Sequence, residues 1–293
     1  MIKIKNIVLS GGGINSLSFL GAFKAIDESD ILDEINTYVG TSAGSMISAL
    51  LIAGFKHDEI YNFCLKFDFS KTDTEFNITN LFEKFGANDG NKVMYVFNRL
   101  LLEKGFNSDT TLKSFYEKTK KKLIICATCV NECKVYYFDY INYPDLELWK
   151  AIRMSISIPL LFEPYKFEDK LFVDGGVVDN FPIQLLKDSL DETLGLSIIG
   201  NDFFNNETEI DDIFVFIKKV FSCSVFCNVN YKIRKYIKNV ITINCERQGY
   251  EYNINEESKS EIFEKGYDAA KKFIKCLKET NSPEKCSNID EEI

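Results

Sequence analysis

The sequence lacks any long uninterrupted apolar run. No segment approaches the roughly 18 consecutive apolar residues of a membrane-spanning helix. The first residues, Met1-Ile2-Lys3-Ile4-Lys5-Asn6, lead directly into a strand-like segment rather than into the apolar core of a secretory signal. We therefore expect an intracellular, cytoplasmic protein without a signal peptide or transmembrane segment, and peripheral contact with membranes remains open.

Basic residues are in the minority. The chain has 35 Lys and Arg residues against 44 Asp and Glu residues, which gives a formal net charge of -9. Contacts to nucleic-acid phosphates require a positive field, so this balance argues against nucleic-acid binding. Hydrophobic residues make up 45% and charged residues 27% of the chain, values that indicate a globular protein rather than a disordered or fibrous one.

The sequence also has too few clustered metal ligands for a typical metal site. Its nine cysteines are an odd number spread over 293 residues, and the simplest account is a reducing compartment with free, mostly buried thiols. Cys126, Cys129 and Cys133 have a spacing that could suggest zinc, but the first two lie in the apolar run 123–130 and no second C-x-x-C pair follows. We expect no metal and no cofactor.

A glycine-bounded serine stands between two apolar segments, in the stretch Gly40-Thr41-Ser42-Ala43-Gly44. This G-x-S-x-G pattern is typical of a nucleophile elbow, where a strand turns sharply into a helix and the residues two before and two after the serine must be small. The apolar segment that follows, up to Gly54, predicts a buried helix whose N-terminus points at the serine and favours negative charge there. An ordinary glycine turn before a core helix gives the same pattern, so the interpretation depends on other motifs.

A glycine-rich loop, residues 10–16, follows the apolar strand-like run 7–9 and precedes a helical stripe. Backbone N–H groups beside a helix N-terminus suit either a phosphate or the oxyanion of an acyl-transfer intermediate. If the two strands are adjacent and parallel, this loop and Ser42 lie at the same edge of the sheet. The candidate oxyanion donors are the N–H groups of Gly11, Gly12 and Gly13.

A nucleotide site is the alternative use of this loop. The dinucleotide-binding pattern requires a third glycine where this chain has Ser16, and an acidic ribose ligand about 20 residues on. Asp33 and Glu34 stand near that distance but in an apparent helix-to-strand turn. The oxyanion interpretation is therefore favoured.

A carboxylate follows a later apolar strand-like run. Asp174 ends this run and is followed by Gly175 and Gly176, which predicts a tight turn at the sheet edge where the other two loops lie. A plain Asp-Gly turn is the alternative, and it is more common.

These motifs, in this order, resemble those of the patatin-like phospholipases. Residues 8–13 resemble the glycine-rich oxyanion loop of that family, and residues 40–44 its nucleophile motif. Residues 151–164 resemble its serine- and proline-containing block, and residues 174–182 its catalytic aspartate motif.

The resemblance extends over residues 6–200 and implies an α/β fold, a three-layer α/β/α sandwich with a mainly parallel central sheet. It implies one acyl hydrolase domain over residues 1–280, followed by a polar tail at 281–293. The implied activity is that of a calcium-independent serine esterase that cleaves fatty-acyl esters, with glycerophospholipids as substrates.

The resemblance also implies a role for individual residues. Ser42 would be the nucleophile and Asp174 the base. The family usually has a basic residue and then a glycine where this chain has Asn15 and Ser16, which affects charge assistance at the loop and head-group preference. The implied oxyanion donors are Gly11, Gly12 and Gly13, and the glycines that support the motifs are Gly40, Gly44, Gly175 and Gly176.

The single histidine independently favours a Ser-Asp dyad over a Ser-His-Asp triad. His57 follows the helix expected after Ser42, and at about 1.5 Å per residue that helix places it about 20 Å away. A carboxylate held about 2.6–3.2 Å from the serine can accept its proton directly. A lipid-binding pseudoenzyme and an acyltransferase with the same dyad are the alternative functions.

A second apolar stripe lies outside these motifs. Six residues share one helical face and are followed by a basic cluster at Lys232, Arg234, Lys235 and Lys238. Either this helix packs on the sheet, or part of its face and the basic cluster contact an anionic membrane. The six residues are Ile213, Phe214, Phe216, Ile217, Val220 and Phe221.

Overall fold

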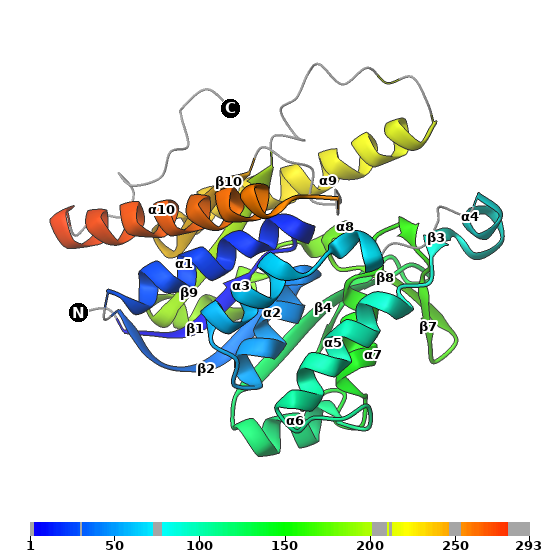
Figure 1. The fold of residues 1–293 in the computed structure, drawn as a ribbon, viewed down its shortest axis with the longest axis horizontal. Helices are drawn as coiled ribbons and strands as arrows, with labels where there is room; N and C mark the ends of the chain where they lie inside the picture. Colours follow the sequence, from blue (N-terminus) through cyan, green and yellow to red (C-terminus); the bar gives the residue numbers. More distant parts are fainter. Residues whose placement is uncertain are drawn as a thin grey trace.

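The computed structural model describes residues 3–29, 31–72, 78–200, 210, 213–245 and 253–280. In these residues an eight-stranded sheet lies between two layers of helices (Figure 1). The predicted three-layer α/β sandwich is therefore confirmed. The proposed polar tail at 281–293 lies outside the described residues.

The strand order is β10-β9-β1-β2-β4-β8-β7, and β5 lies outside this order and pairs with residues 125–129 of β4. The parallel strands are β1 (Ile4–Leu9), β2 (Leu32–Thr41), β4 (Lys122–Cys129), β9 (Thr193–Gly200) and β10 (Val240–Cys245). The antiparallel strands are β5 (Lys134–Phe138), β7 (Tyr165–Phe167) and β8 (Lys170–Asp174). A separate parallel pair is formed by β3 (Gly86–Asn88) and β6 (Leu160–Phe162).

Most helices pack against one face of the sheet. They are α1 (Leu17–Asp27), α2 (Ala43–Ile52), α3 (His57–Lys66), α5 (Asn91–Glu103), α6 (Leu112–Thr119), α7 (Leu148–Ser155) and α10 (Glu256–Thr280). The opposite face is covered by α8 (Gly176–Asp179), η3 (Ile183–Glu192) and α9 (Ile213–Lys235). Shorter elements are η1 (Gly13–Ser16), η2 (Phe69–Thr72), α4 (Ile78–Lys84) and η5 (Ile237–Asn239).

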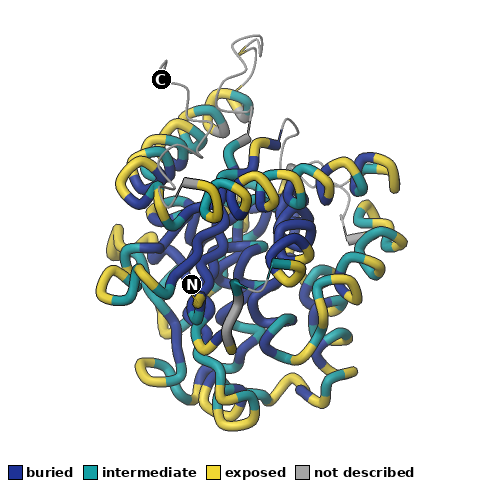
Figure 2. Tube along the Cα trace, turned by 90° about the vertical axis from the view of Figure 1, so that its left-hand side faces the viewer, coloured by how far each residue is buried: buried dark blue, intermediate teal, exposed yellow. Residues whose placement is uncertain are grey.

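Continuous apolar strands form the centre of the sheet because both of its faces are covered. In β1, Ile7 and Leu9 pack into the core beneath α1 and α2, whereas Val8 packs into the core beneath α9. Strand β4 follows the same alternation, with Ile125 in the core beneath α1 and α2 and Ile124 in the core beneath α9. Figure 2 shows the buried residues concentrated in the sheet and in the helix faces that contact it.

Several locally predicted elements are confirmed. The sequence predicts a hairpin from the apolar runs 123–130 and 134–139, and these runs form the antiparallel pair β4 and β5. It also predicts a short amphipathic helix over 146–154, the segment that contains Trp149, and this segment forms α7. Within the described residues seven cysteines are free, but Cys276 is disulfide-bonded, so the expectation of free thiols is wrong at that position. Among the described residues, no helix has the length and apolar character needed to cross a membrane.

The apolar stripe on α9 divides into two halves. In the second half, Val225, Val229 and Ile233 are buried against the sheet, as the core-helix interpretation predicts. In the first half, Phe216 and Val220 are 50% and 55% exposed. The helix therefore packs on the sheet only by its C-terminal part.

Candidate active site

Ser42 occupies a sharp turn between β2 and α2. Its backbone has φ 53° and ψ -129°, a left-handed conformation that is rare for a residue with a side chain. The carbonyl of Ser42 accepts hydrogen bonds from the N–H and hydroxyl groups of Ser45 at 2.9 and 2.6 Å. These contacts hold the turn, and the serine is only 5% exposed.

The glycines on either side of Ser42 allow the chain to fold back on itself. A Cβ atom on Gly40 would lie 2.5 Å from the Cα atom of Ser45. A Cβ atom on Gly44 would lie 2.4 Å from the carbonyl oxygen of Ser10. Both obstacles are backbone atoms, so larger residues at these positions would displace the turn or the glycine loop next to it.

Ser155, at the end of α7, fixes the turn from the other side. Its hydroxyl accepts a hydrogen bond from the N–H of Ser42 at 2.9 Å and donates one to the carbonyl of Cys126 in β4 at 2.6 Å. The turn is thus tied to the neighbouring strand. Ser155 belongs to the serine- and proline-containing block, but no role was assigned to it from the sequence.

Asp174 reaches the same site from an antiparallel strand. Strand β8 pairs with the last part of β4, where Asp174 lies opposite Ala127. The preceding residue of β4, Cys126, pairs with Thr41 of β2, next to Ser42. The Oδ1 atom of Asp174 accepts a hydrogen bond from the N–H of Gly176 at 2.7 Å. Its Oδ2 atom is buried and has no hydrogen-bond partner among the described residues.

Burial controls the charge of this carboxyl group. Desolvation raises the pKa of Asp174 to about 7, although hydrogen bonding by Ser42 and by the Gly176 N–H favours the charged form. The side chain is 3% exposed. Because the Ser42 side chain is close enough to favour the charged form of this carboxyl group, Asp174 is the candidate to accept the serine proton.

The glycine loop lies against both candidate residues. A Cβ atom on Gly11 would be 3.2 Å from the Cβ atom of Ser42 and 2.4 Å from Oδ1 of Asn180. However, the N–H of Gly11 donates to the carbonyl of Asn180 at 3.1 Å, so it is not available to an oxyanion. Gly11 packs the loop against Ser42, and of the three predicted oxyanion donors Gly12 and Gly13 remain the candidates.

Gly12 and Gly13 are half-buried, and their N–H groups have no acceptor in the described part of the chain. Gly13 has φ 54° and begins η1. The two residues where this chain departs from the family pattern, Asn15 and Ser16, are buried in η1 rather than displayed to solvent.

An apolar cavity of about 160 Å³ opens at Ser42 and Gly13. On a scale where one water molecule fills roughly 10–15 Å³, it holds about a dozen heavy atoms. Helices α2, α3 and α5 form most of its wall, with β6. The apolar lining includes Met46, Leu50, Phe63, Phe97 and Phe162.

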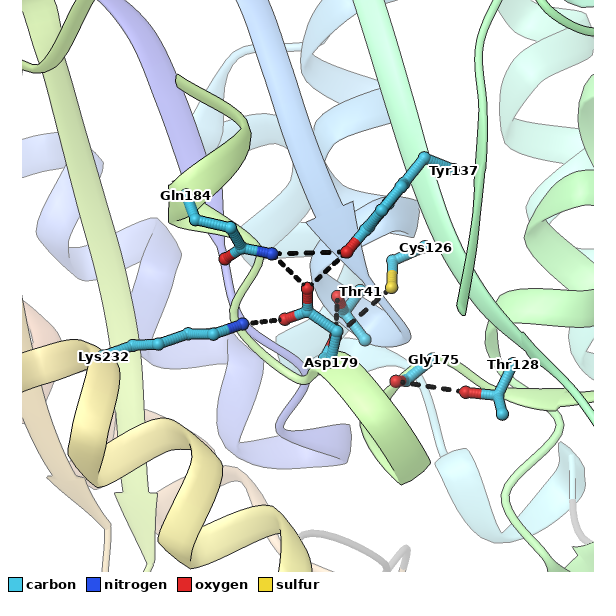
Figure 3. A network of polar contacts seen from close by, with 8 residues as sticks. All are labelled: Thr41, Cys126, Thr128, Tyr137, Gly175, Asp179, Gln184 and Lys232. Atoms are coloured by element: carbon cyan, nitrogen blue, oxygen red, sulfur yellow. Dashed lines mark hydrogen bonds and ion pairs between the residues drawn. The ribbon is translucent and has the colours of Figure 1, made fainter. Parts of the chain in front are cut away.

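A buried polar network holds the turn that follows Asp174 (Figure 3). The backbone carbonyl of Asp179 accepts hydrogen bonds from the Thr41 hydroxyl at 3.1 Å and from the Cys126 thiol at 3.3 Å. Its carboxylate accepts from Tyr137 at 2.6 Å and forms a buried ion pair with Lys232 of α9. The network joins α8, β2, β4 and α9 next to the site.

Sequence reasoning missed this network and left open that Lys232, together with its basic neighbours, contacts a membrane. For Lys232 this alternative is wrong, because the residue is only 8% exposed and is paired with Asp179. The sequence signal that could have revealed the ion pair is Asp179, a second acidic residue within the aspartate motif. If the turn that carries it is buried, its carboxylate requires a cationic partner. Arg153 was missed as well: it is buried, donates to the carbonyls of Asp89 and Glu163, and contacts Ser157.

His57 lies away from the site. It begins α3, beyond the end of α2, and its Nε2 atom is 3.0 Å from a carboxylate oxygen of Asp27 at the end of α1. The cysteines considered as zinc ligands lie in β4 and in the following turn, with Cys126 and Cys129 buried and Cys133 exposed. In the ranges that the structure describes, no group of three or more potential ligands is placed to hold a metal ion.

Gly175 and Gly176 complete the aspartate turn. A Cβ atom on Gly175 would lie 2.4 Å from the carbonyl oxygen of Cys126, and one on Gly176 would lie 3.0 Å from Oδ1 of Asp174. The structure thus brings together Ser42, Asp174 and the three glycine motifs, and it leaves His57 outside.

Known proteins share this arrangement of sequence and fold. The chain is 32% identical over 289 residues to an uncharacterised protein, R571, of Acanthamoeba polyphaga mimivirus, covering 93% of this chain and 94% of that one. It is 33% identical over 186 residues to the probable lipid hydrolase 463L of Invertebrate iridescent virus 6, covering 62% of each chain. Among solved structures, VipD from Legionella pneumophila has a TM-score of 0.58 at 17% identity, covering 93% of this chain and 67% of VipD.

Residues 7–187 match the family described as patatin-like phospholipase, and this segment contains all three glycine motifs, Ser42 and Asp174. The match agrees with the sequence resemblance and with the sandwich fold. The chain therefore belongs to the patatin-like phospholipase family.

Proposed function

We propose that this protein is a lipid acyl hydrolase that uses Ser42 and Asp174 as a catalytic dyad. The observation that carries the proposal is the buried carboxyl group of Asp174, which is close enough to Ser42 for the serine side chain to lower its pKa, while Ser42 itself lines an apolar cavity. A carboxylate with a pKa near neutrality is a stronger base than an exposed one and is still ionised at mildly alkaline pH.

In the first half of the reaction, Asp174 accepts the hydroxyl proton of Ser42 as the oxygen attacks the ester carbonyl. The negative charge that forms on the carbonyl oxygen is stabilised by the N–H groups of Gly12 and Gly13 and by the N-terminus of α2. Asp174 then donates the proton to the leaving alcohol, and the acyl group remains on Ser42.

In the second half, a water molecule gives its proton to Asp174 and attacks the acyl-enzyme. Collapse of the second tetrahedral intermediate releases the fatty acid, and the proton returns to Ser42. The dyad requires no metal in either half, so the proposed activity is calcium-independent.

The proposed substrates are fatty-acyl esters of glycerophospholipids. The cavity at Ser42 is lined by apolar side chains from three helices, which suits an acyl chain better than a polar group. Relatives are described as a probable lipid hydrolase and as an intracellular phospholipase A2 from Caenorhabditis elegans, which favours the same substrate class.

Mass-spectrometric product analysis on mixed phospholipid vesicles tests the proposal. We expect free fatty acid and lysophospholipid, in equal amounts and undiminished by EDTA. Transfer of the acyl group to an added alcohol without free fatty acid would identify an acyltransferase. Absence of any product, together with retained vesicle binding, would identify a lipid-binding pseudoenzyme.

A further inference from the structure

Six large apolar side chains are exposed on two segments near the site. They are between 40% and 74% exposed, although side chains of this kind are usually buried. We call them the docking face: Phe82, Phe85, Ile213, Phe216, Ile217 and Val220.

The first segment is the beginning of α9. Lys232, near the end of this helix, pairs with Asp179, which lies at the level of Thr41 at the carboxyl end of β2. At about 1.5 Å per residue, Val220 lies about 18 Å further along the helix. Because α9 runs from the end of β9 back toward the start of β10, its first turns extend past the carboxyl end of the sheet, as Figure 1 shows.

The second segment is α4 with the residue that follows it. Phe82 is 74% exposed and Phe85 is 60% exposed. The next residue, Gly86, begins β3 and is paired with Leu160 of β6, the strand whose Phe162 lines the cavity. Both segments lie at the same end of the molecule along its longest axis (Figure 1).

We propose that the docking face inserts into the outer layer of a phospholipid bilayer and holds the carboxyl edge of the sheet, with Ser42, against it. The inference rests on the proposed function, because it names where that site takes its lipid from. An acyl chain that leaves a bilayer for the cavity avoids water only if the membrane meets this edge of the protein.

The composition of α9 favours a phospholipid surface over a protein partner. In a chain with a net charge of -9, the 23 residues of this helix contain no Asp or Glu, and the sequence places Lys218 and Lys219 between Ile217 and Val220. Apolar side chains flanked by lysines suit insertion among acyl chains with the cations near lipid phosphates. Lysine, by contrast, is depleted in the core of protein interfaces.

Binding is measured in the Ser42→Ala background, so that the vesicles stay intact. Two double variants, Phe82→Ser with Phe85→Ser and Ile213→Ser with Phe216→Ser, are sedimented with phosphatidylcholine vesicles. The matched control is Ile141→Ser, because Ile141 is 61% exposed but follows β5 at the opposite end of β4. We expect each double variant to lose at least tenfold in vesicle affinity and the control to bind like its parent.

The same double variants, made with Ser42 intact, are assayed on a soluble short-chain ester. We expect unchanged turnover of this ester, an unchanged melting temperature, and a loss of phospholipid turnover that parallels the loss of binding. Unchanged vesicle affinity in both double variants would overturn the proposal. So would a parent protein that is dimeric in solution and becomes monomeric in the variants, because a second copy would then be the occupant. If the parent itself does not hydrolyse the short-chain ester, the proposed function is refuted, whereas the vesicle-binding result still stands.

Discussion

Replacing Asp174 by Asn should raise stability while it removes activity. The asparagine has nearly the same shape and can still accept the hydrogen bond from the Gly176 N–H, but it carries no charge into the buried site. The carboxylate of the parent is 3% exposed and has one unpaired oxygen, so its charged form is costly in the folded state.

The pKa of Asp174 sets the size and the pH dependence of this gain. The pKa of Asp174 rises from its ordinary value of 3.8 to about 7. At about 1.4 kcal/mol per pKa unit, this rise sets an upper limit of about 4 kcal/mol on the gain in the free energy of unfolding. Between these two values the folded protein binds more protons than the unfolded chain, so the parent loses stability as the pH rises. The stability difference between Asp174→Asn and the parent should therefore grow from about pH 4 to about pH 7 and stay constant above it.

Urea titrations at pH 5.5 and 8.5 measure the difference, and kcat/KM on a soluble ester is followed in parallel. The kcat/KM of the parent should increase as the pH rises through about 7. The kcat/KM of Asp174→Asn should be lower than that of the parent by a factor of about 100 to 10,000. Asp169→Asn is the control, since Asp169 lies just before β8 with its side chain 94% exposed. A variant that is less stable than the parent by the same amount at both pH values would refute the buried-charge argument, and retained activity would refute the base.

Ser42→Ala should abolish ester hydrolysis and leave melting unchanged, because Gly40 and Gly44 shape the turn; turnover near that of the parent would exclude Ser42 as nucleophile. Gly12→Ala should lower kcat about 100-fold or more through the loss of an oxyanion donor. Its new Cβ would lie 2.4 Å from the Ile198 terminal methyl, which can move aside, so circular dichroism should show a folded protein. Lys232→Met should cost about 3–5 kcal/mol in urea titration by leaving Asp179 buried without its cation, and a cost below 1 kcal/mol would show that the pair is not structural.

Local sequence patterns were sufficient for the parts of the fold that local chemistry controls. The turn at Ser42 was predictable because glycines at fixed offsets permit backbone contacts that no other residue allows. The hairpin of β4 and β5 was predictable because two apolar runs flank a short polar break. Parallel pairing of β1 with β2 followed from the strand-helix-strand pattern.

Features that depend on distant contacts were not predictable. The occupied N–H of Gly11 depends on the Asn180 carbonyl, which comes from a turn 169 residues later in the chain. The burial of Lys232 depends on the position of Asp179, which its basic neighbours in the sequence do not reveal. The amphipathic pattern of α9 could not reveal that only its second half has a sheet to cover.

Covalent labelling with a fluorophosphonate tests the dyad most directly. Such a probe reacts with a serine only when a base activates the hydroxyl and an oxyanion site holds the phosphoryl oxygen. Peptide mass spectrometry of the labelled parent should find one adduct, on Ser42, formed faster as the pH rises through about 7, and formed at least 100-fold more slowly in Asp174→Asn. Equal labelling rates in the parent and in Asp174→Asn, or an adduct on a serine other than Ser42, would contradict the account.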